Sequence, residues 1–165
     1  MATLTPRPVD WIHTAPVRVS ATRDLAAHPD EVVAALADHE SWPEGFESLS
    51  RVERFGDLPG GVGSNRRVFI GSRVTVDEEF IVWEPGERWG FTNLEASVPG
   101  LRSMNELVTI EPLDGDRSRV TYTMGIEPGW LLAPLLRVAQ GQLRTNLGAA
   151  LEELGRHIGR TRAAA

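Results

Sequence analysis

The stretch that decides the fold is residues 63–111, which read GSNRRVFIGSRVTVDEEFIVWEPGERWGFTNLEASVPGLRSMNELVTIE. It holds four runs rich in β-branched and aromatic residues, the composition typical of strands. Each run is separated from the next by a short turn signal, and the signals are Gly71-Ser72, Pro85-Gly86 and Pro99-Gly100. Short turns join antiparallel neighbours, so the stretch predicts a four-strand meander.

The lengths of these turns predict which residues face each other. A two-residue first turn sets Asn65 opposite Glu78, and a four-residue second turn sets Glu78 opposite Asn93. A two-residue third turn then sets Asn93 opposite Glu106. We therefore expect four polar side chains in one line across the apolar face of the sheet, where carboxylates are rarely placed without a function.

The same registers predict a sheet face that is apolar and aromatic at one end and polar at the other. We expect Ile81 and Trp83 on the opposite face, and Arg67 with Glu95 at the polar end. The apolar members are Val74, Val76, Phe80, Val82, Trp89, Phe91, Met104, Val108 and Ile110, which Tyr122 and Met124 join if Ile110 faces Val120. Such a gradient suits an amphiphilic ligand.

The rest of the chain adds three strands and the helices. We expect strands near residues 17–25, 50–55, 63–70, 73–83, 87–95, 101–111 and 118–127, with two short helices after the first. From Trp130 the apolar period changes to 3.6, which predicts a helix of roughly 28 residues. Its stripe is Leu132, Leu136, Ala139, Leu143, Leu147, Ala150 and Leu154, with Asn146 and His157 in the stripe or at its margin.

Domain organisation follows from the ends of this pattern. Pro6, Pro8 and Pro16 predict a largely irregular N-terminal arm over residues 1–16, whose Trp11 and Ile12 can dock on the body. Residues 17–160 form the single predicted domain, and residues 161–165 a disordered tail.

Composition limits the function classes. A net charge of −6 over 165 residues gives no global field to attract nucleic acid or anionic lipid. The chain has no cysteine, which excludes disulfides and thiol chemistry. No apolar run approaches the roughly 20 residues that span a bilayer, and no signal peptide is visible. These features predict a soluble cytoplasmic protein without integral membrane association, whose oligomeric state stays open.

Several short motifs resemble the START-related helix-grip superfamily of polyketide cyclase/dehydrase and lipid-transport proteins. They are His28-Pro29-Asp30-Glu31-Val32, Ser41-Trp42-Pro43, Gly60-Gly61-Val62-Gly63-Ser64 and Trp83-Glu84-Pro85-Gly86-Glu87-Arg88. The resemblance covers residues 17–158 and implies an α+β fold in which a seven-stranded antiparallel sheet wraps around the long C-terminal helix. It also implies a cavity for a lipid, sterol or aromatic polyketide. Gly45 followed by Phe46 departs from relatives that carry an aromatic residue directly after the Trp-Pro pair.

The buried acids suggest chemistry. Burial favours the protonated form of a carboxyl group, while a nearby Arg67 would oppose this for Glu78. One hypothesis is that Glu106 or Glu78 acts as a general acid or base, with Asn93 or Tyr122 holding an oxyanion. The alternative is that Arg67 and Glu78 form an internal ion pair, that Glu95 and Glu106 reach solvent, and that nothing reacts.

Other reaction types lack support. The four histidines have no spacing that brings two together, so we predict no metal site. No nucleophile elbow exists, and the glycines of residues 60–63 precede a strand without the lysine and helix of a phosphate loop. We predict no cofactor.

The leading hypothesis is a carrier that binds a small hydrophobic or amphiphilic molecule between the sheet and the C-terminal helix. The alternatives are an enzyme of the polyketide cyclase/dehydrase type and a protein–protein interaction module. The predicted ligand-binding residues are Asn65, Arg67, Phe80, Trp89, Phe91, Asn93, Met104, Val108, Tyr122, Met124 and Asn146, with Glu106 and Glu78 as catalytic candidates.

Overall fold

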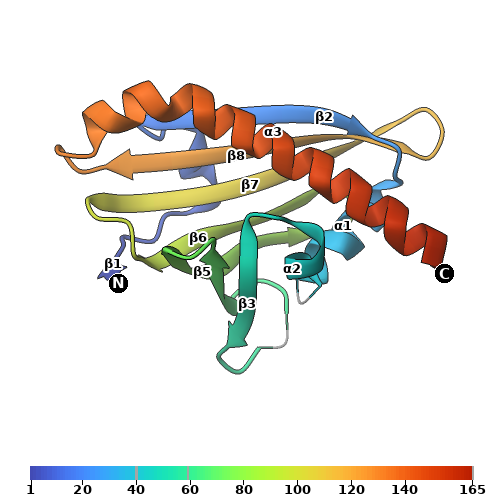
Figure 1. Cartoon of the computed structure of the whole chain (residues 1–165), viewed down its shortest axis with the longest axis horizontal. Helices are drawn as coiled ribbons and strands as arrows, with labels where there is room; N and C mark the ends of the chain where they lie inside the picture. The colour runs from blue at the N-terminus through green and yellow to red at the C-terminus, as the bar shows by residue number, and fades with distance from the viewer. Residues whose placement is uncertain (40, 59, 165) are drawn as a thin grey trace.

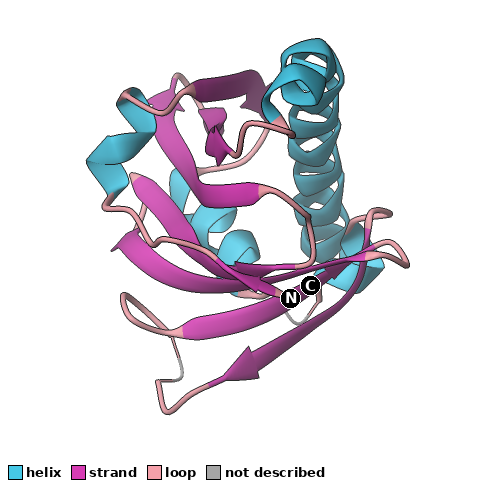
Figure 2. Cartoon of the chain, turned by 90° about the vertical axis from the view of Figure 1, so that its left-hand side faces the viewer, coloured by secondary structure: helices cyan, strands magenta, loops and turns pink. Residues whose placement is uncertain are grey.

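The computed structural model describes residues 1–39, 41–58 and 60–164. One antiparallel sheet has the strand order β2-β8-β7-β6-β5-β4-β3, with β1 added beside β6. The long helix α3 crosses one face of this curved sheet, and the short helices α1 and α2 lie near one end (Figures 1 and 2). The predicted α+β helix-grip architecture is confirmed.

The elements follow the predicted order. The strands are β1 (Ala2–Thr3), β2 (Val17–Leu25), β3 (Leu49–Phe55), β4 (Asn65–Ile70), β5 (Val74–Glu84), β6 (Arg88–Ala96), β7 (Leu101–Leu113) and β8 (Arg117–Pro128). The helices are the 3-10 helix η1 (Val9–His13), α1 (Pro29–Ala37), α2 (Trp42–Gly45) and α3 (Ala133–Ala164). The strand β1 is additional to the seven that the sequence predicts.

Helix α3 is longer than predicted and only half of it is covered. Its buried side chains are Leu147, Leu151, Leu154 and Ile158, all from the middle of the helix onward. The helix continues through Ala164, into the residues expected to form the tail, and residue 165 lies outside the described residues. An ion pair between Arg162 and Glu31 of α1 holds this end in place.

The predicted register between β4 and β5 is wrong by one residue. Ile70 pairs with Val74, so the turn has three residues instead of two and Gly71 adopts a positive φ of 56°. Because side chains alternate between the faces of a strand, a shift by one exchanges the two faces of β4. Arg66 therefore stands opposite Glu78 inside the sheet.

The register between β5 and β6 contains a β-bulge, which brings most of the pairing back to the prediction. Glu84 pairs with Arg88, one residue away from the predicted pairing, but an irregularity between Phe80 and Val82 restores the predicted partners further along. The pairs Phe80–Phe91 and Glu78–Asn93 are confirmed. As a consequence, Val82 lies on the outer face of the sheet and Trp83 on the inner face, the reverse of the prediction.

These two side chains find new partners on their faces. Val82, expected inside, is buried on the outer face with Ile12 and Leu107. Trp83, expected outside, packs against Phe80 with ring centroids 4.8 Å apart.

The register between β6 and β7 differs from prediction by two residues. Phe91 pairs with Glu106, so Glu106 is not opposite Asn93, although it stays on the expected face because the shift is even. This pairing ends at Thr92–Asn105, beyond which the two strands separate. The sequence left the register between β7 and β8 open; the structure pairs Ile110 with Val120, the pairing on which the inward placement of Tyr122 and Met124 depends.

The N-terminal arm occupies the gap between β6 and β7. The backbone N–H of Leu4 donates to the Leu94 carbonyl and that of Thr5 donates to the Arg102 carbonyl, so the arm hydrogen-bonds to both strands. The Arg7 guanidinium donates to Ser103 and pairs with Glu127. The expected docking of Ile12 is observed on the outer face of the sheet, where this side chain is buried.

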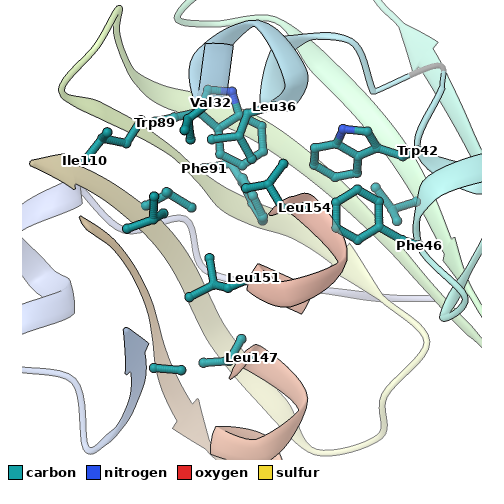
Figure 3. Close-up of a cluster of buried hydrophobic side chains, with 14 of the residues drawn as sticks. Val32, Leu36, Trp42, Phe46, Trp89, Phe91, Ile110, Leu147, Leu151 and Leu154 are labelled. Atoms are coloured by element: carbon teal, nitrogen blue, oxygen red, sulfur yellow. The ribbon is translucent and has the colours of Figure 1, made fainter. Parts of the chain in front are cut away.

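The core lies between the sheet, α1, α2 and the second half of α3. Figure 3 shows Leu147, Leu151 and Leu154 of α3 facing side chains from the sheet and the short helices. The other labelled members are Val32, Leu36, Trp42, Phe46, Trp89, Phe91 and Ile110, all part of one buried cluster.

Candidate functional site

A cavity of about 480 Å³ lies between the sheet, α2 and α3. Ligand pockets for small organic molecules are usually of roughly 300–1,000 Å³, so this one is large enough. Its sheet wall is Arg66, Val68, Ile70, Glu78, Trp89, Phe91, Glu106, Val108, Tyr122 and Met124. Strand β3 adds Leu49. The helices and connections contribute Leu36, Trp42, Phe46, Ser48, Leu143, Asn146, Leu147, Ala149, Ala150, Leu151, Glu153 and Leu154. The lining is mostly apolar, with a few polar groups.

Arg66 is the most unusual of these polar groups. Its side chain is 1% exposed, and its Nε donates to Glu78 Oε2 over 2.6 Å. The guanidinium carbon lies 4.4 Å from the ring centroid of Trp42 and 4.9 Å from those of Phe80, Trp89 and Phe91. Aromatic faces stabilise a cation that has left water. One guanidinium nitrogen, Nη1, is buried without a hydrogen-bond partner.

Glu106 and Tyr122 form the second polar pair of the cavity. The Tyr122 hydroxyl donates to Glu106 Oε2. Burial, and then the neighbouring negative charge of Glu78, raise the pKa of Glu106 to about 7. Burial and then Glu106 raise the pKa of Tyr122 above its usual value, so the phenol keeps its proton. Burial also raises the pKa of Glu78, and the adjacent Arg66 opposes that rise.

Near neutral pH, Glu106 is therefore a group that can give up or take a proton, while Tyr122 stays a donor. This is the condition that general acid–base catalysis requires of a side chain.

Asn93 is a further buried polar residue on this face of the sheet. It is fully buried on the same face as Glu78, its partner across β5 and β6, and neither its side-chain oxygen nor its nitrogen has a hydrogen-bond partner. Asn93 is not part of the cavity lining. Buried amides without partners are rare in proteins, and they mark places where a water or a ligand oxygen completes the hydrogen bonding.

The structure brings together most of the predicted site residues. Glu78, Glu106, Trp89, Phe91, Val108, Tyr122, Met124 and Asn146 line the cavity. Phe80 lies behind Trp89, with ring centroids 5.1 Å apart, and Met104 packs against the core without lining the cavity. Asn146 is exposed at the rim, where its side-chain oxygen accepts from Gln142.

Asn65 and Arg67 are corrections. Both lie on the outer face of β4, since the one-residue register shift turns Arg66 inward in their place. Arg67 forms an exposed-face pair with Asp77, with Nε and Oδ1 2.6 Å apart, instead of the predicted internal pair with Glu78. The proposed ion pair inside the sheet exists, but with the neighbouring arginine.

Sequence reasoning missed Arg66 and the helical walls. Nothing in the pattern of two adjacent arginines tells which one faces inward. The walls had a visible signal, because Leu36, Trp42 and Leu147 belong to apolar helical stripes. Those stripes predict burial, and whether they bury against a solid core or around a hollow depends on the placement of α3.

His39 is a buried residue that packs next to the polar end of the site. The ring is buried and stacks on Phe80, with centroids 6.0 Å apart and an angle of 24° between the planes. Its Nε2 accepts from Arg54 Nε. Burial, and then the positive charges of Arg66 and Arg54, lower the pKa of His39 to about 4, which keeps the ring neutral.

Among the described residues, no three His, Asp or Glu side chains gather as a metal site would require. No helix within the same ranges is long and apolar enough to span a bilayer.

The family model for polyketide cyclase/dehydrase and lipid transport matches residues 16–159. The chain belongs to this polyketide cyclase/dehydrase and lipid-transport family. An uncharacterised protein of Mycobacterium tuberculosis is 31% identical over 149 residues, which cover 90% of this chain and 89% of the relative. Family membership and the cavity together make the chain a helix-grip protein of the ligand-binding or polyketide cyclase type.

Solved structures share the fold at low identity. A Thermus thermophilus protein superposes with a TM-score of 0.73 at 20% identity, covering 88% of this chain and 99% of that one. The Zhui aromatase/cyclase of a Streptomyces species gives a TM-score of 0.70 at 19% identity, over 87% of this chain and 94% of the other. Norcoclaurine synthase of Thalictrum flavum gives 0.69 at 14% identity, over 97% and 96%.

Proposed function

We propose that this family member binds a small hydrophobic molecule carrying polar oxygens in the cavity between the sheet and α3. The observation that carries the proposal is the contrast within one cavity. Its walls are apolar, while the buried Arg66, Glu78 and Glu106 and the half-buried Tyr122 lie at its sheet side. Apolar walls hold a hydrocarbon body, and a few fixed polar groups orient its oxygens.

Arg66 and Tyr122 are the donors that would meet these oxygens. Arg66 keeps one unpartnered N–H group, so a ligand carbonyl or hydroxyl that reached it would satisfy a buried donor. Tyr122 could donate to a ligand oxygen when Glu106 is protonated, since that carboxyl can then supply its own proton.

Native mass spectrometry of the protein purified from its own host tests binding. The expected result is a retained small molecule. The variant Ala150→Trp, which fills the cavity from α3, should lose it, while the control Ala163→Trp, exposed at the end of α3, should retain it. Equal retention by both variants, or no retained molecule in any form, would overturn the proposal.

A second candidate function is an enzyme that cyclises, dehydrates or isomerises the bound molecule. The observation favouring it is Glu106, whose pKa of about 7 lies in the working range of a general base. The Glu106 carboxylate would remove a proton from an acidic C–H or hydroxyl group, and the Tyr122 phenol would donate to the oxygen on which negative charge develops.

The retained molecule decides between carrier and enzyme. A carrier returns it unchanged after incubation, whereas an enzyme converts it to a product of altered mass or altered retention. If Glu106 is the base, the rate should rise as the pH passes about 7, and Glu106→Gln should abolish turnover while binding persists. Unchanged turnover in that variant would exclude this role.

A further inference from the structure

The first half of α3 and the turn before it carry an apolar surface that nothing in the chain covers. Trp130, Leu131, Leu135 and Val138 are 77%, 70%, 64% and 86% exposed. Leu135 and Val138 are three residues apart in α3 and therefore lie on one side of the helix, exposed to solvent, and Trp130 and Leu131 precede them in the turn before α3. Monomeric proteins rarely leave such a contiguous group of large apolar side chains in water.

This surface is locally positive in a protein that is negative overall. Residues 128–151 contain Arg137 and Arg144 and no acidic residue, although the whole chain has a net charge of −6. Arg102 of β7 lies beside Gly129 at the start of this segment. At physiological salt charges act over roughly 10 Å, so the local sign matters more than the net charge for what approaches this surface.

We infer that Trp130, Leu131, Leu135 and Val138 dock the protein on the surface of an anionic lipid bilayer. An exposed apolar stripe flanked by arginines is the composition of helices that lie in the membrane interface. Tryptophan prefers the level of the lipid headgroups. The long arginine side chains can reach the phosphates while their stems stay against apolar surface.

A second copy of the chain fits this surface less well. A two-fold interface would place the same segment against itself. Arg137 and Arg144 would then face arginines, with no acid in residues 128–151 to pair with them.

The docking surface lies on the same helix as one part of the cavity rim. Asn146 and Ala149, both exposed, lie at the cavity rim on the same helix, two to three turns after Val138. At 1.5 Å per residue the rim is roughly 12 Å from the docking surface. A protein seated on this surface would hold the cavity mouth close to the bilayer. Bilayer binding itself does not depend on what the cavity holds.

Co-sedimentation of the full chain with vesicles tests the inference. We expect binding to vesicles of phosphatidylcholine mixed with phosphatidylglycerol, and weaker binding to phosphatidylcholine alone. Trp130→Ala with Val138→Thr should weaken the binding about tenfold or more, because two apolar side chains no longer insert. The matched control is Val62→Thr, a similarly exposed apolar residue of the β3–β4 loop, which should bind as the wild type does.

A second double variant, Arg137→Gln with Arg144→Gln, tests the contribution of the positive charges. This variant should lose the preference for phosphatidylglycerol, while Arg160→Gln at the far end of α3 keeps it. All substituted residues are exposed, so circular dichroism should show unchanged folding. Absence of vesicle binding, or equal binding by the Trp130→Ala, Val138→Thr variant, would overturn the inference. The wild-type protein could instead form a dimer that the Trp130→Ala, Val138→Thr variant cannot form, and bind no vesicles. That result would assign the surface to a second copy of the chain and would also overturn the inference.

Discussion

Arg66 and Glu78 form an ion pair across β4 and β5, with Nε and Oε2 2.6 Å apart and both side chains 5% exposed or less. Removing one partner of such a pair leaves the other as a buried, uncompensated group. We expect Arg66→Met to lower the free energy of unfolding by about 3–5 kcal/mol. Arg66→Met with Glu78→Leu should recover most of that loss, because two apolar side chains replace the pair.

Urea unfolding of the two single variants and the double variant measures this coupling. A double variant as unstable as the sum of both single variants would contradict it, since independent sites add.

Glu106 makes stability depend on pH. Its pKa of about 7 in the folded protein lies above the ordinary value of 4.5, so the folded state holds the proton more tightly. The stabilisation is complete below about pH 4.5 and is lost as the pH rises through about 7, on the order of 3 kcal/mol in all. Glu106→Gln should reduce this fall, because the amide does not ionise. Urea unfolding at several pH values tests it, and an unchanged profile would count against a buried Glu106.

His39 contributes a pH dependence of stability with the opposite sign. The pKa of the buried ring is about 4 in the folded protein, below the ordinary 6.5, so folding favours the neutral form. Its contribution is fully present above about pH 6.5 and is lost as the pH falls through about 4. His39→Phe keeps an aromatic ring against Phe80 and should be less sensitive to acid than the wild type between these limits. Thermal unfolding at pH 4 and pH 7 measures the difference, and equal acid sensitivity would contradict the assignment.

Two glycines of this chain should respond oppositely to alanine. A Cβ at Gly90 would lie 2.7 Å from the backbone carbonyl oxygen of Glu106, so β6 and β7 would have to move apart. Gly90→Ala should cost about 1–3 kcal/mol and disturb Glu106. A Cβ at Gly141 of α3 meets nothing within 4 Å, and Gly141→Ala should add about 0.5–1 kcal/mol, since alanine is the better helix former. Denaturation midpoints compare them, and equal stability of both variants would show that β6 and β7 can separate without cost.

Local patterns were enough to predict the seven longer strands and the inner face from β5 to β8, except that Val82 and Trp83 of β5 lie on the opposite faces. Alternation of apolar and polar residues and the turn glycines and prolines are properties of neighbouring residues, so they survive without tertiary information. Glu106, Trp89, Phe91 and Tyr122 were placed on the correct face for this reason. The shift of two residues between β6 and β7 left that face unchanged.

Only the tertiary structure decided which arginine is inside and how the polar groups meet. One extra residue in the turn at Gly71 exchanges Arg67 for Arg66, because a strand alternates with a period of two and a single-residue slip reverses every side chain. The arm hydrogen-bonds to β6 and β7 where the two strands separate, close to the Phe91–Glu106 pair, and it comes from far away in the sequence. The hollow itself depends on how α3 sits over the sheet, which the periodicity of its stripe does not determine.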